Sequence, residues 1–104
     1  MAARTPTSAL TPPSNAIYPK NRIRKITVLY DGTKPPYNEF SIAELELLNG
    51  TTAIGIRHDR NEWNATTNKN GYPVVRGGRP SWFILPDINA LLPVLNEVFN
   101  EKNK

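Results

Sequence analysis

The chain has 104 residues, of which 38% are hydrophobic and 21% charged, enough for one domain with a modest core. Its net charge of +4 favours a polyanionic partner without requiring one, and the absence of cysteine excludes disulfides and thiolate metal sites. No apolar run approaches the roughly 20 residues of a membrane helix. The chain opens without a secretory signal, so we expect an intracellular protein (cytoplasmic, nuclear or organellar) without membrane contact.

Residues 1–21 have the composition of a basic, Pro/Ser/Thr-rich tail. They hold four of the ten prolines and few apolar side chains to offset the entropy of ordering, so we expect this segment to be flexible. No acid precedes Asp31, whereas Arg4 and Lys20 do precede it. A flexible arm that follows phosphates and an inert linker both fit this pattern. The single folded domain is then predicted over residues 22–104.

Residues 22–30 are predicted to form the first strand, because side chains of different character alternate along them. The consecutive prolines Pro35 and Pro36 lie beyond its end and cannot donate ladder hydrogen bonds.

Residues 40–48 fit two structures. A capping box at Ser41–Glu44 favours a helix, whereas Asn49–Gly50 between alternating residues is a strong hairpin signal. We predict the hairpin because it makes one face apolar in both strands. The predicted pairs are Leu47 with Thr52, Leu45 with Ile54, Ala43 with Ile56, and Ile42 with Arg57, with Arg57 on the outer surface.

Two further β-rich runs, residues 52–60 and 72–85, flank a polar loop over residues 64–71 and predict a second hairpin. Gly77–Gly78 is expected to allow a bulge or bend in the last strand. Because Trp82 and Phe83 alternate, we expect Phe83 to face the core with Leu85, and Trp82 to face solvent.

Residues 87–104 are predicted to form a helix that Asp87 caps. Either Pro93 kinks this helix, or its regular part begins near Asn89 and tolerates a proline in its first turns. Its apolar residues fall at helical spacing and should cover a sheet face and part of a second subunit: Ile88, Leu91, Leu92, Leu95, Val98 and Phe99. The predicted fold class is therefore α+β, a four-stranded curved antiparallel sheet followed by a C-terminal helix (ββββα), forming a homodimer.

The residues that could perform catalysis are few, so we do not expect an enzyme, a cofactor or a metal site. His58 is the only histidine, and the adjacent Asp59 would point to the opposite face of a strand. Gly77–Gly78 lacks the Lys-Ser/Thr and the strand-to-helix context of a phosphate loop.

Arginines interleaved with aromatic residues suit single-stranded nucleic acid, because the charges attract phosphates and the flat rings stack on bases. The expected binding residues are Lys25, Arg57, Arg60, Trp63, Lys69, Tyr72, Arg76, Arg79 and Trp82. Aromatic residues in the core with a solvated rim of arginines would give the same pattern.

Three short motifs resemble a known group of proteins. Ile54-Gly55-Ile56-Arg57, followed later by Phe83-Ile84-Leu85 and the helix at Asp87, is similar to the transcriptional coactivators called positive cofactor four. Arg76-Gly77-Gly78-Arg79 with Ser81 resembles Pur-alpha-like domains, and Whirly domains share the general plan. The resemblance covers about residues 40–100. It implies a curved sheet, a homodimer joined through its helices, and single-stranded nucleic acid across the strands.

The expected function is single-stranded DNA or RNA binding with little sequence specificity, in transcription, replication or recombination. The alternative is a structural or protein-interaction subunit of a viral or organellar assembly.

Overall fold

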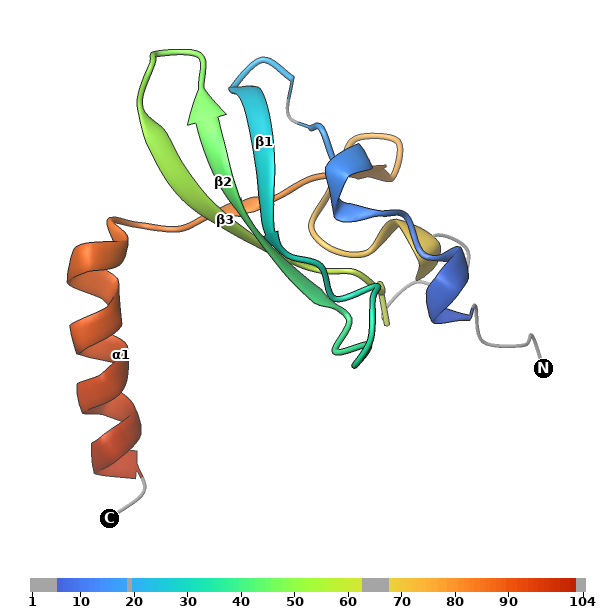
Figure 1. Cartoon of the computed structure of the whole chain (residues 1–104). Coiled ribbons are helices and arrows are strands. Elements are labelled where there is room, and N and C mark those ends of the chain that lie inside the picture. The colour runs from blue at the N-terminus through green and yellow to red at the C-terminus, as the bar shows by residue number, and fades with distance from the viewer. Residues whose placement is uncertain (1–5, 19, 63–67, 103–104) are drawn as a thin grey trace.

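A four-stranded antiparallel sheet and a C-terminal helix form the framework of the chain, which confirms the predicted α+β class (Figure 1). The computed structural model describes residues 6–18, 20–62 and 68–102. The sheet has the order β1 (Ile23–Tyr30), β2 (Phe40–Leu47), β3 (Thr52–His58) and β6 (Phe83–Ile84). The remaining elements are β4 (Val74–Val75), β5 (Arg79–Pro80), α1 (Ile88–Lys102), and short 3-10 turns at Thr7–Ala9, Pro13–Asn15 and Asn68–Asn70.

The β2–β3 hairpin is present, but its register differs from the predicted one by one residue. The Leu47 amide donates to the Thr51 carbonyl at 2.8 Å, so three residues rather than two form the loop. Gly50 adopts φ +86°, the left-handed conformation that such a loop requires. Because side chains alternate between faces, this single step places the two members of every predicted pair on opposite faces of the sheet.

The shifted register defines two faces of the sheet. The inner face carries the pairs Ser41–Arg57, Ala43–Gly55 and Leu45–Ala53. The outer face carries the pairs Phe40–His58, Ile42–Ile56 and Glu44–Ile54. Arg57 therefore lies on the inner face, and its predicted place on the outer surface is wrong.

The expected fourth strand over residues 72–85 is broken into shorter pieces. Tyr72 bridges His58 on β3, the chain then leaves the sheet as the small β4–β5 hairpin, and only β6 returns to pair with β3. Gly77 and Gly78 adopt φ +86° and +74° and form the turn of the β4–β5 hairpin rather than a bulge. The alternation assumed for Trp82 and Phe83 therefore does not continue an unbroken strand.

The N-terminal segment packs against the sheet, contrary to the flexible tail expected over residues 1–21. Leu10, Pro13 and Ala16 are buried, and Ala16 belongs to the main core cluster. The Trp82 indole N–H donates to the Ala16 carbonyl at 2.5 Å. Figure 1 shows the segment, in blue, crossing beside β1. Residues 6–18 therefore belong to the folded domain, and the predicted boundary between a tail and the domain near residue 22 is wrong for them.

The core lies between this segment and the inner face. Its buried apolar members are Ala16, Ile23, Ala43, Leu45 and Trp82, with Ile26, Leu47 and Ile84 partly buried around them. Trp82 is 4% exposed and Phe83 42% exposed, so the two residues occupy the opposite positions to those expected from alternation.

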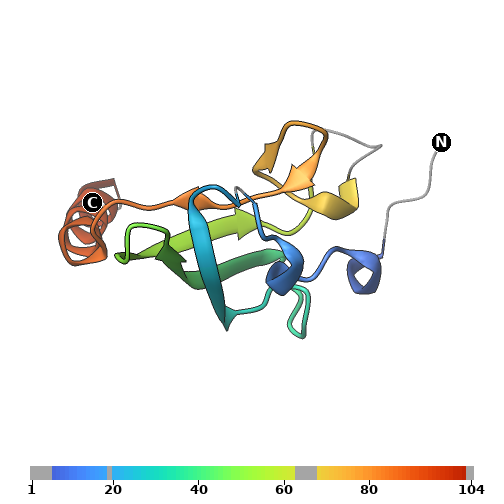
Figure 2. The same cartoon turned by 90° about the horizontal axis from the view of Figure 1, so that it is seen from above.

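Helix α1 begins as predicted and then extends away from the sheet. The Asp87 side chain accepts a hydrogen bond from the Asn89 amide at 3.0 Å, which is the predicted N-cap. Figures 1 and 2 show α1 beside the sheet rather than across it, at the end opposite the β4–β5 hairpin. The expected cover of a sheet face by this helix is therefore not made within one chain. No helix in the described part of the chain is long and apolar enough to span a membrane.

Candidate nucleic-acid interface

Two segments without acidic residues, far apart in the sequence, lie side by side in the fold. Residues 6–18 and 20–30 contain no Asp or Glu, and neither do residues 68–86. The Thr11 amide donates to the Lys69 carbonyl at 2.8 Å, and Tyr18 forms a parallel bridge with Ser81. The folding of the chain thus joins two positively charged stretches into one surface.

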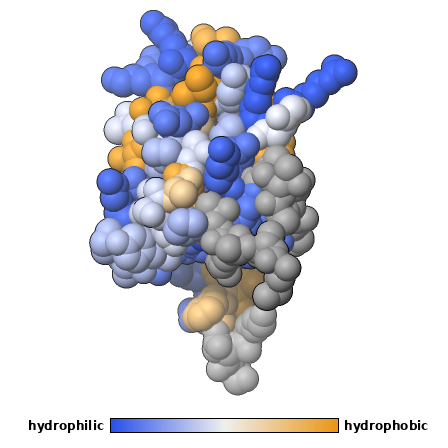
Figure 3. Space-filling model, turned by 90° about the vertical axis from the view of Figure 1, so that its right-hand side faces the viewer, coloured by the Kyte–Doolittle hydropathy of each residue, from blue (hydrophilic) through white to orange (hydrophobic). Residues whose placement is uncertain are grey.

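Tyr18 is the centre of this surface. The Lys20 ammonium and the Arg79 guanidinium each lie 5.3 Å from the centroid of its ring. Exposed cations at this distance gain a modest attraction from the ring while remaining available to anions. We call this patch the basic surface, and its members are Tyr18, Lys20, Lys69, Arg76 and Arg79. Figure 3 looks onto this side of the molecule, where hydrophilic side chains predominate around smaller apolar patches.

The β4–β5 hairpin holds two of these arginines. The Gly78 amide donates to the Val75 carbonyl at 3.0 Å across the turn, and the Asn70 side chain donates to the Gly78 carbonyl at 3.0 Å. Arg76 and Arg79 therefore sit on a short, anchored turn, and both are exposed. Such anchoring keeps two charges in place for phosphates without a long flexible loop.

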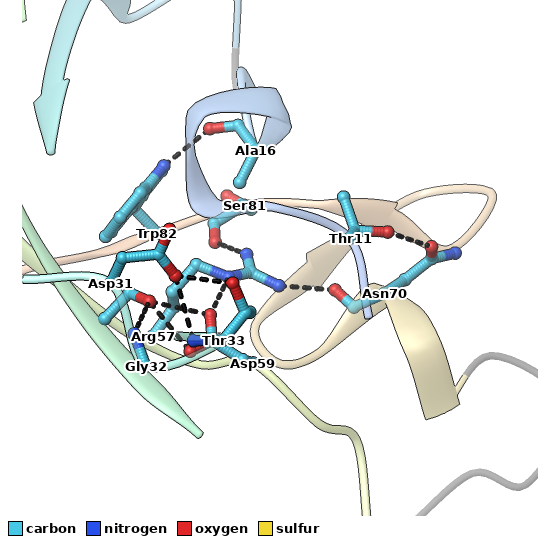
Figure 4. Close-up of polar contacts among 11 residues, drawn as sticks. Thr11, Ala16, Asp31, Gly32, Thr33, Arg57, Asp59, Asn70, Ser81 and Trp82 are labelled. Carbon is cyan, nitrogen blue, oxygen red and sulfur yellow. Dashed lines mark hydrogen bonds and ion pairs between the residues drawn. The ribbon is translucent and has the colours of Figure 1, made fainter. Parts of the chain in front are cut away.

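Arg57 was predicted to contact nucleic acid, but it is only 1% exposed. Its guanidinium donates to the carbonyls of Ser81 and Asn70, as the dashed lines in Figure 4 show. Burial lowers the pKa of Arg57 to about 10, so the group is still protonated at neutral pH. Arg57 thus connects β3 to the segments before and after the β4–β5 hairpin, and is not available to a ligand.

The counter-charge of Arg57 is Asp59, whose carboxylate lies 3.9 Å from the Arg57 Nε. The Ser41 hydroxyl lies 2.7 and 2.9 Å from the two Asp59 oxygens, and it accepts a hydrogen bond from the Gly32 amide at 3.1 Å. Burial raises the pKa of the Asp59 carboxyl, while the Ser41 hydrogen bond and the Arg57 charge act in the opposite direction. This cluster is a buried structural ion pair at the inner face of the sheet.

Arg60 is likewise inaccessible to a ligand, because it is only 3% exposed. It donates to both Glu39 oxygens at 2.9–3.2 Å and to the Asn68 side chain at 2.5 Å. A two-pronged contact of this kind fixes the guanidinium, so Arg60 ties the start of β2 to the turn after β3.

The remaining predicted residues divide between different surfaces. Lys69, Arg76 and Arg79 lie on the basic surface, whereas Lys25 is exposed on β1, opposite Glu46 of β2. Tyr72 lies beside His58 at the edge of the outer face, and Trp82 is buried in the core. Trp63 lies outside the described residues. Of the eight expected residues that the structure describes, it therefore brings three together on the basic surface.

Sequence reasoning missed Tyr18 and Lys20, which were assigned to the tail. An available signal was the complete lack of acids in two separate stretches, which makes any surface they share strongly basic.

Within the described ranges, no group of three or more His, Asp or Glu side chains is arranged to hold a metal ion. Comparisons of the chain with protein-family models, with curated proteins and with solved structures found no match. The resemblance to the positive cofactor four, Whirly and Pur-alpha-like domains therefore stays a hypothesis carried by the motifs alone.

Proposed function

We propose that this chain binds single-stranded nucleic acid, with its phosphates on the basic surface. The observation that carries the proposal is the junction of two acid-free segments around Tyr18. The four cations of the basic surface have no acid in their own segments. They therefore attract a phosphate backbone and release its counterions. The Tyr18 ring among these cations adds a flat face for an unpaired base, which a duplex would hide.

The proposal implies weak sequence preference, because phosphate contacts and stacking read no base edges. A part in transcription, replication or recombination follows only from the resemblance noted above, and we propose it on that basis.

A second proposal concerns assembly. Leu92, Leu95, Val98 and Phe99 on α1 are 51–66% exposed, although they fall at helical spacing on one stripe. An apolar stripe of this kind is costly in water and suits a partner. We propose that α1 joins two copies of the chain into a homodimer. The alternative function, a structural or protein-interaction subunit, is compatible with the same dimer.

The test is a fluorescence-polarisation titration of the full chain with a labelled single strand and its matching duplex at two salt concentrations. We expect tighter binding to the single strand. Arg76→Gln with Arg79→Gln should weaken binding to all single strands alike and make the log–log salt slope shallower by about 0.7 per lost phosphate contact.

Lys34→Gln is the matched control, because it removes one exposed charge from a loop that also carries Asp31 and Glu39. It should leave the affinity nearly unchanged. Failure to bind any single strand at low salt would end the nucleic-acid proposal and favour the protein-interaction alternative.

A further inference from the structure

Planar rings line up across the outer face at the end of the sheet where β2 begins and β3 ends. Phe40 on β2 lies opposite His58 on β3, and His58 exchanges two backbone hydrogen bonds of 2.8 Å with Tyr72. Tyr30 and Phe83 flank these three residues on β1 and β6. Neighbouring strands are about 4.8 Å apart, so the rings follow one another across the sheet.

The rings form two close pairs at the sides of this line. The Tyr30 and Phe40 centroids are 5.1 Å apart with planes inclined by 25°, and those of Tyr72 and Phe83 are 5.4 Å apart with an inclination of 57°. Phe40, Tyr72 and Phe83 are nevertheless 37–42% exposed. We call this set the ring row: Tyr30, Phe40, His58, Tyr72 and Phe83.

We infer that the ring row is a stacking platform for the bases of the strand whose phosphates lie on the basic surface. The inference rests on the proposed function and names the second half of the same site. The two surfaces are linked along the chain: Tyr72 lies three residues after Lys69 and two residues before β4, and its bridge to His58 holds it at the edge of the outer face. On this inference, a single strand passes from the arginines of the β4–β5 hairpin over Tyr72, beside the end of β3, to the other rings.

The other candidate occupant of the outer face is helix α1 of a second copy, and the structure favours a different place for it. A cleft of about 490 Å³, lined by Thr52, Ile54 and the start of α1 at Asp87 and Ile88, lies near the opposite end of β3. Aliphatic side chains at that end, such as Ile54, Leu85 and Ile88, lie beside polar ones, and the cleft adjoins the first turn of α1. The ring row offers flat faces instead, which suit bases better than aliphatic helix side chains.

The platform adds affinity without adding sequence preference or ionic contacts. Every base has a π-face, so stacking on Phe, Tyr or His tolerates any sequence. Replacing a ring should therefore weaken binding while the salt slope remains as in the unmodified chain.

The experiment compares Phe40→Leu, Tyr72→Leu and Phe83→Leu with the unmodified protein in the polarisation titration. Leucine keeps an apolar side chain on the strand but removes the flat face. We expect each variant to bind a mixed-sequence single strand about 5- to 100-fold more weakly with an unchanged salt slope. Leu48→Ala is the control, because Leu48 is exposed at the far end of the β2–β3 hairpin.

A second measurement does not depend on variants that fold. Ultraviolet cross-linking of the unmodified protein to a labelled single strand, read by mass spectrometry, should place cross-links on Tyr72 or Phe83. Cross-links and affinity losses at the ring row support the inference. Unchanged affinity in all three variants, without cross-links there, overturns it.

The arginine and ring variants separate the two proposals. If Arg76→Gln with Arg79→Gln lowers affinity and salt slope while the ring variants bind normally, the ring row is wrong and the proposed function stands. If only the ring variants lose affinity, the ring row stands and the basic surface is wrong. If the ring variants change the mass in light scattering but not the affinity, the ring row is a contact between subunits. That result would overturn the inference.

Discussion

The Arg57 guanidinium lies 5.9 Å from the ring centroid of Trp82, and both side chains are almost fully buried. This is the arginine–aromatic combination that a nucleic-acid surface would use, placed inside the molecule. The pair holds β3 against the segment that precedes β6, and the Trp82 indole in turn binds the N-terminal segment. Replacing either residue of this pair should therefore lower the stability of the fold.

Arg57→Met is expected to lower the free energy of unfolding by about 3–5 kcal/mol, because it leaves Asp59 buried without its counter-charge. The carbonyls of Ser81 and Asn70 also lose their donors. Urea unfolding followed by circular dichroism measures the change. Arg76→Met removes an exposed arginine and should stay within about 0.5 kcal/mol of the unmodified protein. Equal stability of the two variants would contradict the buried role of Arg57.

The Asp59 carboxyl should leave a signature in the pH dependence of stability. Burial raises its folded pKa above the ordinary 3.8, so the folded chain holds this proton more strongly than the unfolded chain does. The contribution of Asp59 to the free energy of unfolding is therefore greatest below pH 3.8 and declines as the pH rises through the folded pKa.

Asp59→Asn cannot ionise and lacks this decline. The difference in free energy of unfolding, unmodified minus Asp59→Asn, should fall as the pH increases above 3.8, as urea titrations at several pH values would show. A difference that grows with pH would show that the Arg57 charge outweighs burial.

Leu10→Ala tests the integration of the N-terminal segment. Leu10 is 3% exposed, so the substitution should cost about 2–5 kcal/mol of unfolding free energy. Leu29→Ala makes the same change at a side chain that is 58% exposed and should cost far less. Thermal unfolding of both variants distinguishes a packed segment from a dispensable tail, and an unaltered midpoint for Leu10→Ala would mean the latter.

Leu95→Glu tests the proposed homodimer. A charge in the exposed stripe of α1 should reduce the mass in light scattering from two chains to one while circular dichroism stays unchanged. Asn96→Glu places the same carboxylate on a neighbouring polar position and should leave the dimer intact. A single-chain mass for the unmodified protein at tens of micromolar would remove the homodimer proposal.

Local signals in the sequence were sufficient for the framework of the fold. The Asn49–Gly50 turn and the alternation around it identified the β2–β3 hairpin, and Asp87 marked the start of α1. They did not identify which residues close the turn. Leu47 and Leu48 are both apolar, so the pattern could not distinguish a two-residue loop from a three-residue loop.

The rest depended on contacts between distant residues. Leu10, Pro13 and Ala16 show neither a strand period nor a clear helix period, and their burial follows from the inner face that receives them. Trp82 faces inward because the Gly77–Gly78 turn resets the alternation before β6. Tyr18 and Lys20, two of the five members of the basic surface, join it through the same long-range packing, which a pattern read along a single strand does not show.

The hydrogen bond between Trp82 and Ala16 joins residues 66 positions apart. While a ribosome makes this chain, the N-terminal segment emerges long before the tryptophan that anchors it, and the inner face of the first hairpin stays open in the interval. Late, long-range closure of this kind slows folding and exposes apolar strands during synthesis. The prolines of the N-terminal segment pair poorly as strands, and the cations that follow it, from Lys20 to Lys25, repel one another, which would keep nascent chains apart until closure.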